Sequence, residues 1–332
     1  MSFFSSFFNG KSILCPFCLT ENRYAKEIDH CLKCKEELPA QYVSNYEQAP
    51  PFFVQLIGWS GVGKTVYLQT LTLMLKKMER FWKNRYVCSP LTEITREFMK
   101  DVRVYEATGT MPASNQEILH DAYTMLLLGM ERWGGRTLVT RDVAGEDFVN
   151  LQFPLEHMPY LMHVPVTLMM ISLSDLKKDN RLSVDELMNS YVDTLVRNKK
   201  NYKTSNLKVI IVLSKADKIK DELPTSLRNY LESDPFDIRK QENNFKDWDF
   251  MNEYMNNLYK MSKNTRNWFT KTQPGGRMLL SKASRAGLSL EFTLISSTGS
   301  DPGQDAKMLV NLNPMRVLDP YFLALDFYSK GG

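Results

Sequence analysis

The chain has 332 residues, of which 43% are hydrophobic and 24% are charged, and its formal net charge is +4. This composition is typical of a soluble globular protein, and the length suits one large α/β domain plus a small module. The small net charge gives no argument for nucleic-acid binding, and no apolar run approaches the ~20 residues that cross a bilayer, so neither a specific nucleic acid nor a transmembrane segment is expected.

The first eight residues include four phenylalanines, at positions 3, 4, 7 and 8. They lack the basic leader and the longer apolar core of a signal peptide, so we expect a cytoplasmic protein. Such a Phe-rich segment either packs on its own domain, docks on a partner or makes a weak contact with a membrane surface. The sequence leaves these alternatives open.

Two Cys-x-x-Cys pairs follow, Cys15 with Cys18 and Cys31 with Cys34. Each pair can place two thiolates on one metal ion, and two pairs complete a tetrahedron of four sulfurs, so the spacing predicts a closed, structural zinc site. Disulfides are the rival interpretation, but the lone Cys88 and the lack of a secretion signal favour a reducing compartment. A redox-active Cys-x-x-Cys is the third alternative.

Residues 37–51 are polar and contain three prolines, which predicts a linker. A zinc ribbon with its Phe-rich end and linker would then occupy residues 1–48, and a larger domain residues 49–332. A module of about 45 residues needs a metal or another crosslink, because it cannot bury a sufficient core.

Gly58 to Thr65 read Gly-Trp-Ser-Gly-Val-Gly-Lys-Thr and fit the phosphate-binding pattern G-x-x-x-x-G-K-[ST]. The apolar run Phe52–Ile57 predicts a buried strand before this loop, and Val66–Trp82 predicts a helix after it. Lys64 would supply a mobile charge to the β- and γ-phosphates, and Thr65 would offer its hydroxyl to Mg²⁺. The residues whose backbone would surround the phosphates are Gly58, Ser60, Gly61, Val62 and Gly63.

Arg136–Arg141 predicts a second strand, and the sequence Asp-Val-Ala-Gly follows it at residues 142–145. Asp142 at the strand end can hold Mg²⁺ directly or through water, and the N–H of Gly145 can meet a γ-phosphate, so hydrolysis would free the loop that follows. Just upstream, Tyr123–Met130 is apolar and precedes a Gly-Gly turn signal, which predicts a hairpin over 123–142. A helix over 116–130 is the competing interpretation.

Leu207–Leu213 is a continuous apolar run that predicts a buried strand. It leads into Ser-Lys-Ala-Asp at residues 214–217. The Asp217 carboxylate can accept both N–H groups of a guanine Watson–Crick edge, and the stem of Lys215 can lie along the ring. Because adenine offers no such pair of donors, Asp217 would select GTP over ATP.

The remaining chain predicts a helix over Phe245–Trp268 and a strand over Leu290–Ile295. The strand ends in Ser-Ser-Thr-Gly at residues 296–299. A loop of small residues at this point can direct backbone N–H groups at the guanine O6, with Ser296 and Ser297 supporting the base.

These four strand-end motifs, in this order, resemble the translation-factor and Ras-like class of P-loop GTPases over roughly residues 52–330. The resemblance implies that Lys64 and Thr65 bind phosphate and Mg²⁺, that Asp142 and Gly145 begin switch II, and that Lys215 and Asp217 recognise guanine. The sequence of residues 142–148, and Pro314–Pro320 near the C-terminus, look more narrowly similar to the bacterial double-GTPase families. Those families are predicted, largely from gene neighbourhoods, to act in conflict and defence systems.

The chain departs from the class at three positions. Glu146 stands where Ras-like proteins have the glutamine that orients the attacking water, and its charge opposes the phosphate, so slow hydrolysis is expected. Ser214 replaces an asparagine whose amide ties the base loop to the P-loop, so weaker nucleotide affinity is expected. The switch I residue is assigned to Ser114, within the loop-like segment Glu106–Asn115.

The sequence thus predicts a doubly wound, mostly parallel α/β sheet with nucleotide at the carboxyl ends of its strands, preceded by a zinc ribbon. The expected function is a GTP-binding protein with slow, Mg²⁺-dependent hydrolysis that changes shape at residues 106–115 and 142–160 and switches an unidentified protein partner. The first alternative is a non-hydrolysing adaptor that binds through its ribbon and Phe-rich end. The second is an ATP-using P-loop enzyme, against which Asp217 argues.

Overall fold

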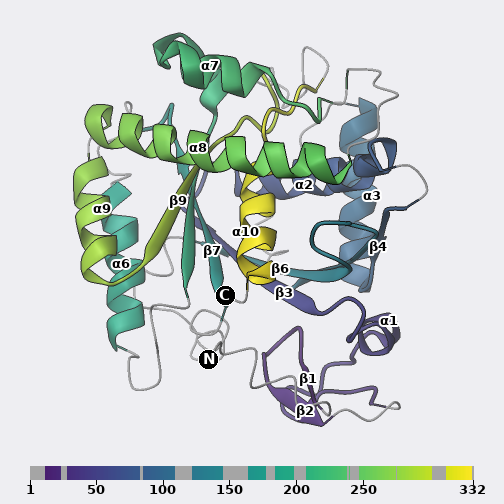
Figure 1. Cartoon of the computed structure of the whole chain (residues 1–332). Coiled ribbons are helices and arrows are strands. Elements are labelled where there is room, and N and C mark those ends of the chain that lie inside the picture. The colour runs from purple at the N-terminus through teal and green to yellow at the C-terminus, as the bar shows by residue number, and fades with distance from the viewer. Residues whose placement is uncertain are drawn as a thin grey trace.

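A single seven-stranded sheet forms the centre of the molecule, with helices on both faces and a small two-stranded module at one end (Figure 1). The computed structural model describes residues 12–23, 28–82, 85–108, 122–144, 164–176, 184–197, 207–237, 239, 247–273, 275–300 and 312–330. The Phe-rich segment 1–8 lies outside them. The expected α/β fold with a mostly parallel sheet is confirmed.

The strand order is β4-β5-β6-β3-β7-β8-β9, and the five strands from β6 to β9 are parallel to one another. The central strands β3, β7 and β8 read as nearly continuous apolar runs because helices cover both faces of a parallel sheet. The strands are β3 (Pro51–Gly58), β4 (Val87–Pro90), β5 (Tyr123–Leu128), β6 (Arg136–Ala144), β7 (Val166–Ser172), β8 (Lys208–Ser214) and β9 (Ser289–Leu294).

The predicted hairpin forms from β5 and β6, which pair antiparallel with Tyr123 opposite Thr140. Gly129 and Gly134 in its connection adopt positive φ angles of 79° and 69°, which glycine tolerates without strain. The competing helix is wrong for the described residues from 123 onward.

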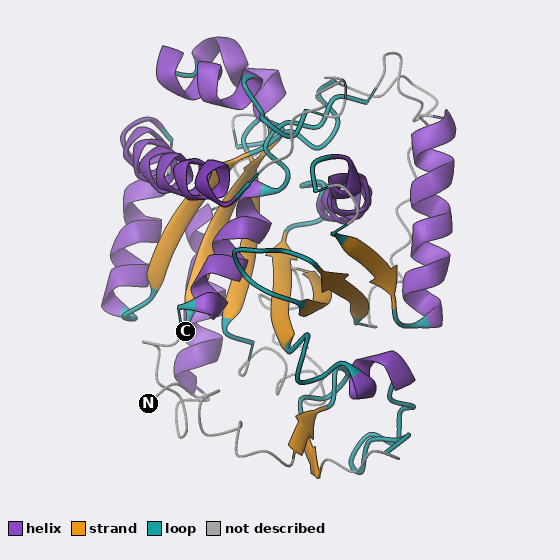
Figure 2. Cartoon of the chain, turned by 45° about the vertical axis from the view of Figure 1, so that its right-hand side comes forward, coloured by secondary structure: helices purple, strands orange, loops and turns teal. Residues whose placement is uncertain are grey.

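The helices are α2 (Lys64–Lys77), η1 (Met78–Arg80), α3 (Glu93–Thr108), α6 (Val184–Arg197), η5 (Ala216–Glu222), α7 (Thr225–Glu232), α8 (Trp248–Thr272), α9 (Gly276–Arg285) and α10 (Asp319–Ser329). Phe52 contacts Tyr321 of α10 with ring centroids 5.5 Å apart. Gln55, on the opposite face of β3, bonds Thr167, which bonds Tyr191 of α6. The helices α10 and α6 therefore cover opposite faces of the sheet (Figure 2).

Helix α3 corrects part of the expected switch I loop. Residues 106–108 are helical, because the buried stripe of Phe98, Val102 and Tyr105 extends the amphipathic pattern to the end of the helix. The Thr108 hydroxyl also donates to the Val104 carbonyl oxygen at 2.8 Å. Residues 109–115, with Ser114, lie outside the described part of the chain.

The N-terminal module contains β1 (Ser12–Leu14), β2 (Glu21–Arg23) and α1 (Ala40–Ser44). The prediction of a linker over 37–51 is wrong, because this segment forms α1 and packs on the module. Tyr42 is fully buried, and its hydroxyl donates to the Leu14 carbonyl oxygen at 2.6 Å. The polar composition of the segment hid the few apolar side chains that anchor it.

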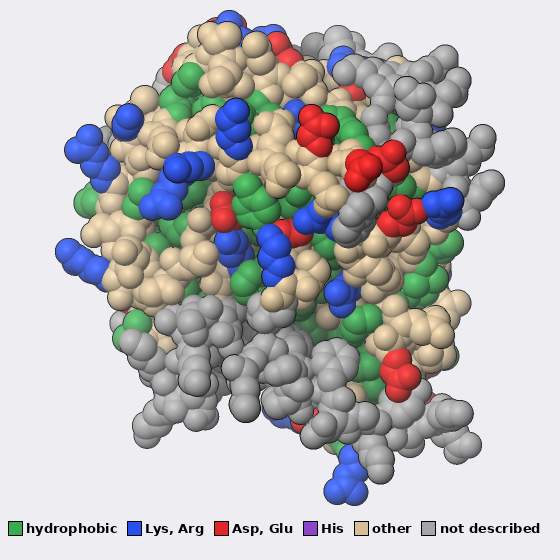
Figure 3. All heavy atoms as spheres, in the orientation of Figure 1, with side chains coloured by type: hydrophobic (Ala, Val, Ile, Leu, Met, Phe, Trp, Pro, Cys, Tyr) green, Lys and Arg blue, Asp and Glu red, His purple; other side chains and the backbone are tan. Residues whose placement is uncertain are grey.

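Positive charge gathers on one helix pair, α8 and α9, on the face seen in Figure 3. Between Tyr254 and Arg285 the sequence has no acidic residue, and its basic residues are Lys260, Lys263, Arg266, Lys271, Arg277, Lys282 and Arg285. The modest net charge of the chain therefore hides a local excess. None of the helices in the described residues combines the length and hydropathy needed to cross a bilayer.

Candidate functional site

The P-loop connects β3 to α2, and three of its positions require glycine. A Cβ on Gly58 would lie 2.9 Å from both the Met170 carbonyl oxygen and the Val62 side chain. Gly61 and Gly63 have φ angles of +78° and +95°, a region in which other residues are strained. Gly58 is therefore required because a side chain would not fit, and Gly61 and Gly63 are required because of their backbone conformation.

Lys64 and Thr65 are the first two residues of α2, directly after its N-cap Gly63. The first N–H groups of a helix have no acceptor within the helix, and the helix dipole makes this end attractive to anions. The Lys64 ammonium donates to the carbonyl oxygens of Gly58, at 2.7 Å, and Trp59, at 3.2 Å. The loop thus combines N–H donors and a cation in one place, which suits a phosphate.

Asp142 lies near the end of β6 and is 8% exposed. It pairs with Leu56 of β3, and two residues later Ala144 pairs with Gly58, the first residue of the P-loop. Because parallel neighbours end at the same edge of a sheet, Asp142 lies at the edge of the sheet from which the P-loop leads to Thr65 in α2. Gly145 and Glu146 lie outside the described residues.

Ser214 corrects the expectation of a lost connection to the P-loop. Its hydroxyl donates to the carbonyl oxygen of Val62 at 2.9 Å and lies 3.3 Å from that of Ile171. The serine side chain is shorter than asparagine, but it lies at the end of β8, close enough to reach the loop without an amide. Serine in place of asparagine therefore replaces an amide with a hydroxyl and still connects this loop to the P-loop.

Lys215 makes a second contact with the P-loop and a contact that the sequence did not predict. Its ammonium donates to the Gly61 carbonyl oxygen at 3.0 Å and to the Asp175 carboxylate at 2.7 Å. Burial alone would raise the pKa of Asp175, but hydrogen bonds from Lys215, Ser172 and Ser174 hold that pKa below its ordinary value. Asp175 therefore stays ionised and fixes the lysine.

Asp217 is joined to the last of the four loops. The Ser296 hydroxyl donates to the Asp217 carboxylate at 2.5 Å, and the Gly299 N–H donates to the same hydroxyl at 2.9 Å. Ser297 follows as a half-buried residue, and the Ala216 N–H donates to the Ile295 carbonyl oxygen at 3.1 Å. This network orients the Asp217 carboxylate.

The structure thus brings the P-loop, the Ser-Lys-Ala-Asp loop and the Ser-Ser-Thr-Gly loop into one connected group at the carboxyl ends of β3, β8 and β9. Asp142 belongs to the neighbouring strand end. Sequence reasoning missed Asp175, although a carboxylate three residues after the buried strand β7 follows the same strand-end pattern as the residues it did identify. The roles of these side chains toward a nucleotide stay predictions.

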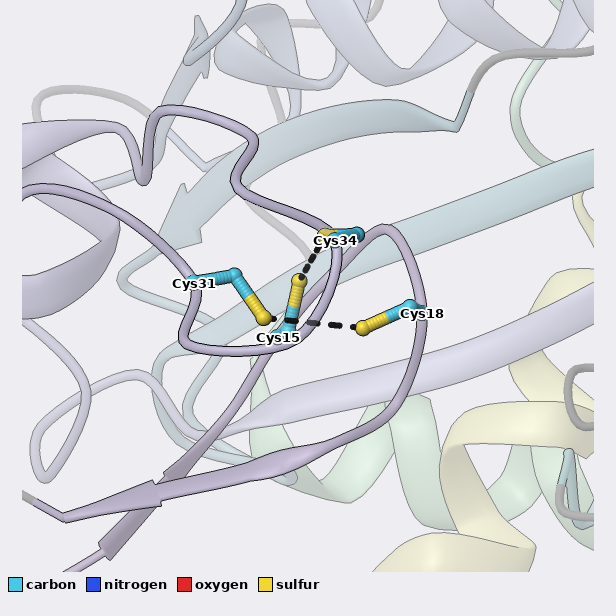
Figure 4. A group of neighbouring side chains, drawn as sticks. All are labelled: Cys15, Cys18, Cys31 and Cys34. Carbon is cyan, nitrogen blue, oxygen red and sulfur yellow. Dashed lines mark hydrogen bonds between the residues drawn. The ribbon is translucent and has the colours of Figure 1, made fainter.

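The four cysteines that were predicted to form one metal site lie close together in the N-terminal module (Figure 4). Their sulfur atoms all lie within 4.8 Å of one another, and two of the separations are 3.7 Å and 3.6 Å. Four ligands at the Zn–S distance of about 2.3 Å form a tetrahedron with edges of about 3.8 Å, so the arrangement fits zinc. All four positions of the metal would be filled by protein, which suits a structural role.

The two cysteine pairs form matching turns. The Leu19 N–H donates to the Cys15 carbonyl oxygen, and the Lys35 N–H donates to that of Cys31, each at 3.0 Å. Leu19 and Lys35 also share a left-handed conformation, with φ angles of 58° and 65°. A repeated turn that aims two sulfurs at one point is what a four-thiolate site requires.

Cys88 in β4 takes no part in this cluster. It is 3% exposed, and burial raises the pKa of its thiol to about 12. The side chain therefore stays a neutral thiol in the core.

Comparison with known proteins does not identify the function of the chain. No protein-family model matches the chain, and no curated protein matches it. Among solved structures, it is similar to a chain of the signal recognition particle receptor SRb-GTP/SRX complex from Chaetomium thermophilum, with 11% sequence identity over 76% of this chain and 94% of that chain. The TM-score of 0.29 is too low to bear on function, which we infer from the site alone.

Proposed function

We propose that this chain is a guanine-nucleotide-binding protein that hydrolyses GTP slowly and acts as a switch toward a protein partner. The observation that carries the proposal is the connection between Asp217 and the P-loop. Ser296 orients the Asp217 carboxylate, and the neighbouring Ser214 and Lys215 bond the P-loop carbonyl groups. A carboxylate that would bind the base, linked through its neighbours to a loop that would bind the phosphates, suits a nucleoside polyphosphate.

Within this proposal, each group has a distinct task. The P-loop N–H groups and Lys64 bind the phosphates, and Thr65 and Asp142 hold Mg²⁺, which supplies charge neutralisation at the phosphate oxygens. Asp217 accepts the guanine N–H groups, and Lys215 supports the ring. Catalysis is then mainly positioning and electrostatic stabilisation, because phosphoryl transfer demands little covalent chemistry of the protein.

The slow rate and the switch are proposed from residues outside the described part of the chain. Glu146 follows the Asp-x-x-G glycine, and a carboxylate accepts a hydrogen bond from water without donating one to the γ-phosphate. We therefore infer slow intrinsic turnover that a partner accelerates, with Ser114 and Gly145 as the γ-phosphate contacts. The setting in a bacterial conflict or defence system rests on the sequence likeness alone.

The alternative is an adaptor in which the nucleotide is structural and the zinc ribbon binds the partner. Glu146 favours it, because its charge disfavours hydrolysis. A single-turnover assay of phosphate release from bound GTP separates the two functions: a measurable first-order release supports the GTPase, and stable GTP over hours supports the adaptor.

Base selection tests the proposal directly. We expect the wild-type chain to bind GDP at least a hundredfold more tightly than ADP, and Asp217→Asn to shift the preference toward xanthosine diphosphate, whose base presents the complementary group. Asp221→Asn is the matched control, because Asp221 is 87% exposed and lies only four residues along η5. Equal binding of GDP and ADP by the wild type, measured by isothermal titration calorimetry, would refute the guanine assignment.

A further inference from the structure

Arg141 links the zinc ribbon to the strand that carries Asp142. Its guanidinium donates to the Phe17 carbonyl oxygen at 2.6 Å, and Phe17 lies between Cys15 and Cys18. Arg141 and Asp142 are consecutive residues of β6, so their side chains point to opposite faces of the sheet. The ribbon therefore contacts one face of β6 directly behind the proposed Mg²⁺ ligand on the other face.

The position of the Phe17 carbonyl group depends on the cysteine turn around it. The Phe17 N–H donates to the Cys15 sulfur at 3.3 Å, and the Leu19 N–H closes the turn on the Cys15 carbonyl oxygen. The flanking strands β1 and β2 have three residues each, which is too short to hold this turn by themselves. A metal bound by the four sulfurs would join the two cysteine turns and so fix the acceptor of Arg141.

The ribbon also packs on residues that come a few positions after the two segments assigned to the switches, 106–115 and 142–160. Leu14 forms an apolar cluster with Phe53, Ala122, Val139 and Val164, against which Phe17 and Leu19 also pack. In the sequence, Ala122 follows directly after residues 109–121, and Val164 directly after residues 145–163. The ribbon accordingly contacts the first described residue after each of these two ranges.

We propose that Arg141 is a positioning residue through which zinc binding at the four cysteines and nucleotide binding at the P-loop favour each other. This inference rests on the proposed nucleotide-binding function. When the metal orders the first cysteine turn, the Phe17 carbonyl group holds Arg141, and Arg141 holds the end of β6 with Asp142 in the position that binds Mg²⁺. Loss of the metal frees Arg141, and the strand end loses that support.

Such coupling is reciprocal, because each ligand changes the affinity of the other by the same factor. Couplings of this kind are commonly about 5- to 150-fold. We expect about tenfold here, since one charge-assisted hydrogen bond and one small apolar contact carry it. Bound Mg²⁺ and nucleotide should therefore lower the free zinc concentration at equilibrium about tenfold relative to the nucleotide-free protein.

The test measures zinc transfer from the full-length protein to a chromophoric chelator at equilibrium, with and without saturating Mg²⁺ and GDP. Nucleotide occupancy is followed in the same samples with a fluorescent GDP analogue. We expect nucleotide to suppress zinc transfer in the wild type, Arg141→Gln to abolish this dependence, and Arg141→Lys, which retains a cationic donor, to restore part of it. Arg136→Gln, on the same strand and away from the ribbon contact, should behave as the wild type.

Two results distinguish failure of this inference from failure of the proposed function. If the wild type binds the GDP analogue and its zinc transfer is unaffected by nucleotide, the coupling is refuted and the proposed function stands. If the wild type binds no guanine nucleotide, both are refuted. Because the wild-type comparison needs no substitution, poor folding of Arg141→Gln would leave the test decisive.

Discussion

At the scale of single side chains, two serine hydroxyls hold the loops that would bind the base. Ser214 donates to the Val62 carbonyl oxygen, and Ser296 donates to the Asp217 carboxylate. Each hydroxyl has only one hydrogen to donate, so each serine fixes one acceptor. Removal of either hydroxyl would leave its acceptor without that donor.

Ser214→Ala should weaken GDP binding about five- to tenfold, because the loss of one buried neutral hydrogen bond costs about 1–1.4 kcal/mol. Ser214→Asn, which restores the amide usual in the resembling GTPases, should bind at least as tightly as the wild type. Isothermal titration calorimetry measures both, with Ser284→Ala on the exposed side of α9 as the control. Equal affinity of wild type and Ser214→Ala would show that the Val62 contact does not support the nucleotide.

Asp175→Asn should lower GDP affinity about three- to fivefold, because Lys215 loses a partly exposed ion pair of roughly 0.5–1 kcal/mol. The pKa of Asp175 is held below its ordinary value, so its contribution is present above that value and is lost only as the pH falls through the lowered pKa. The affinity ratio of wild type to variant should therefore be the same at pH 6 and pH 8. An affinity ratio that changes between pH 6 and pH 8, or one equal to that of Asp221→Asn, would contradict the role of ionised Asp175 in holding Lys215.

At the scale of whole elements, a buried polar network joins α7, α8 and α10. The fully buried Asp319 carboxylate accepts hydrogen bonds from the Tyr230 hydroxyl of α7, at 2.7 Å, and from the Tyr254 hydroxyl of α8. The Arg316 guanidinium lies 3.7 Å from the centre of the Tyr230 ring, and the Arg316 N–H donates to Asp234. These groups are the charged and titratable neighbours that set the pKa of Asp319.

The network reaches the base loop through Met315. This residue precedes Arg316 and pairs with Ser296, each N–H donating to the carbonyl oxygen of the other at 2.8 Å and 3.0 Å. The C-terminal segment that contains Met315 and Arg316 therefore supports the loop that orients Asp217.

Burial raises the pKa of Asp319 from an ordinary value of 3.8 to about 6, although Arg316 opposes the shift. The folded carboxyl group thus binds a proton more readily than the unfolded one, so its contribution to stability is fully present below about pH 4 and is lost as the pH rises through about 6. Asp319→Asn cannot titrate. The free energy of unfolding of the wild type minus that of the variant should therefore be larger at pH 5 than at pH 7.5.

Urea unfolding at the two pH values measures this difference. Asp221→Asn serves as the control, because an exposed carboxyl group should give no comparable pH dependence. A difference between wild type and Asp319→Asn that stays constant or grows toward pH 7.5 would show that the buried carboxyl group does not take up a proton in this range.

How far the sequence predicts these elements depends on how local their determinants are. The strands β8 and β9 and the hairpin were predicted within a residue or two, because uninterrupted apolar runs and glycine turns are local signals. The sequence did not predict helix α1, because its segment is polar and rich in proline. The few apolar side chains in it reveal a helix only once their packing against the rest of the ribbon is known. The contacts of Ser214 and Asp175 depend on which loop lies opposite, and this is set by strand order rather than by nearby sequence.

At the scale of the whole molecule, the ribbon packs against the larger domain through two small apolar clusters. Ile13 and Tyr42 of the module share an apolar cluster with Leu91 and Leu126, which belong to the region of β4 and β5. The second cluster, around Leu14, covers Phe53 and Val139 on the face of the sheet that also carries Gln55. The ribbon therefore covers this part of the sheet.

If the four sulfurs bind zinc as proposed, its removal should expose this face. Structural zinc supplies folding free energy to small modules, so we expect Cys34→Ser to open residues 12–48 to trypsin and to lower the melting temperature by about 5–10 °C. The sheet from β3 to β9 should resist cleavage, because its own core is larger. Limited proteolysis with mass spectrometry and a thermal melt measure both effects, with Cys88→Ala as the control that loses a buried thiol outside the cluster. Cleavage and melting of Cys34→Ser that match those of the wild type would mean that the four sulfurs hold no metal on which the ribbon depends.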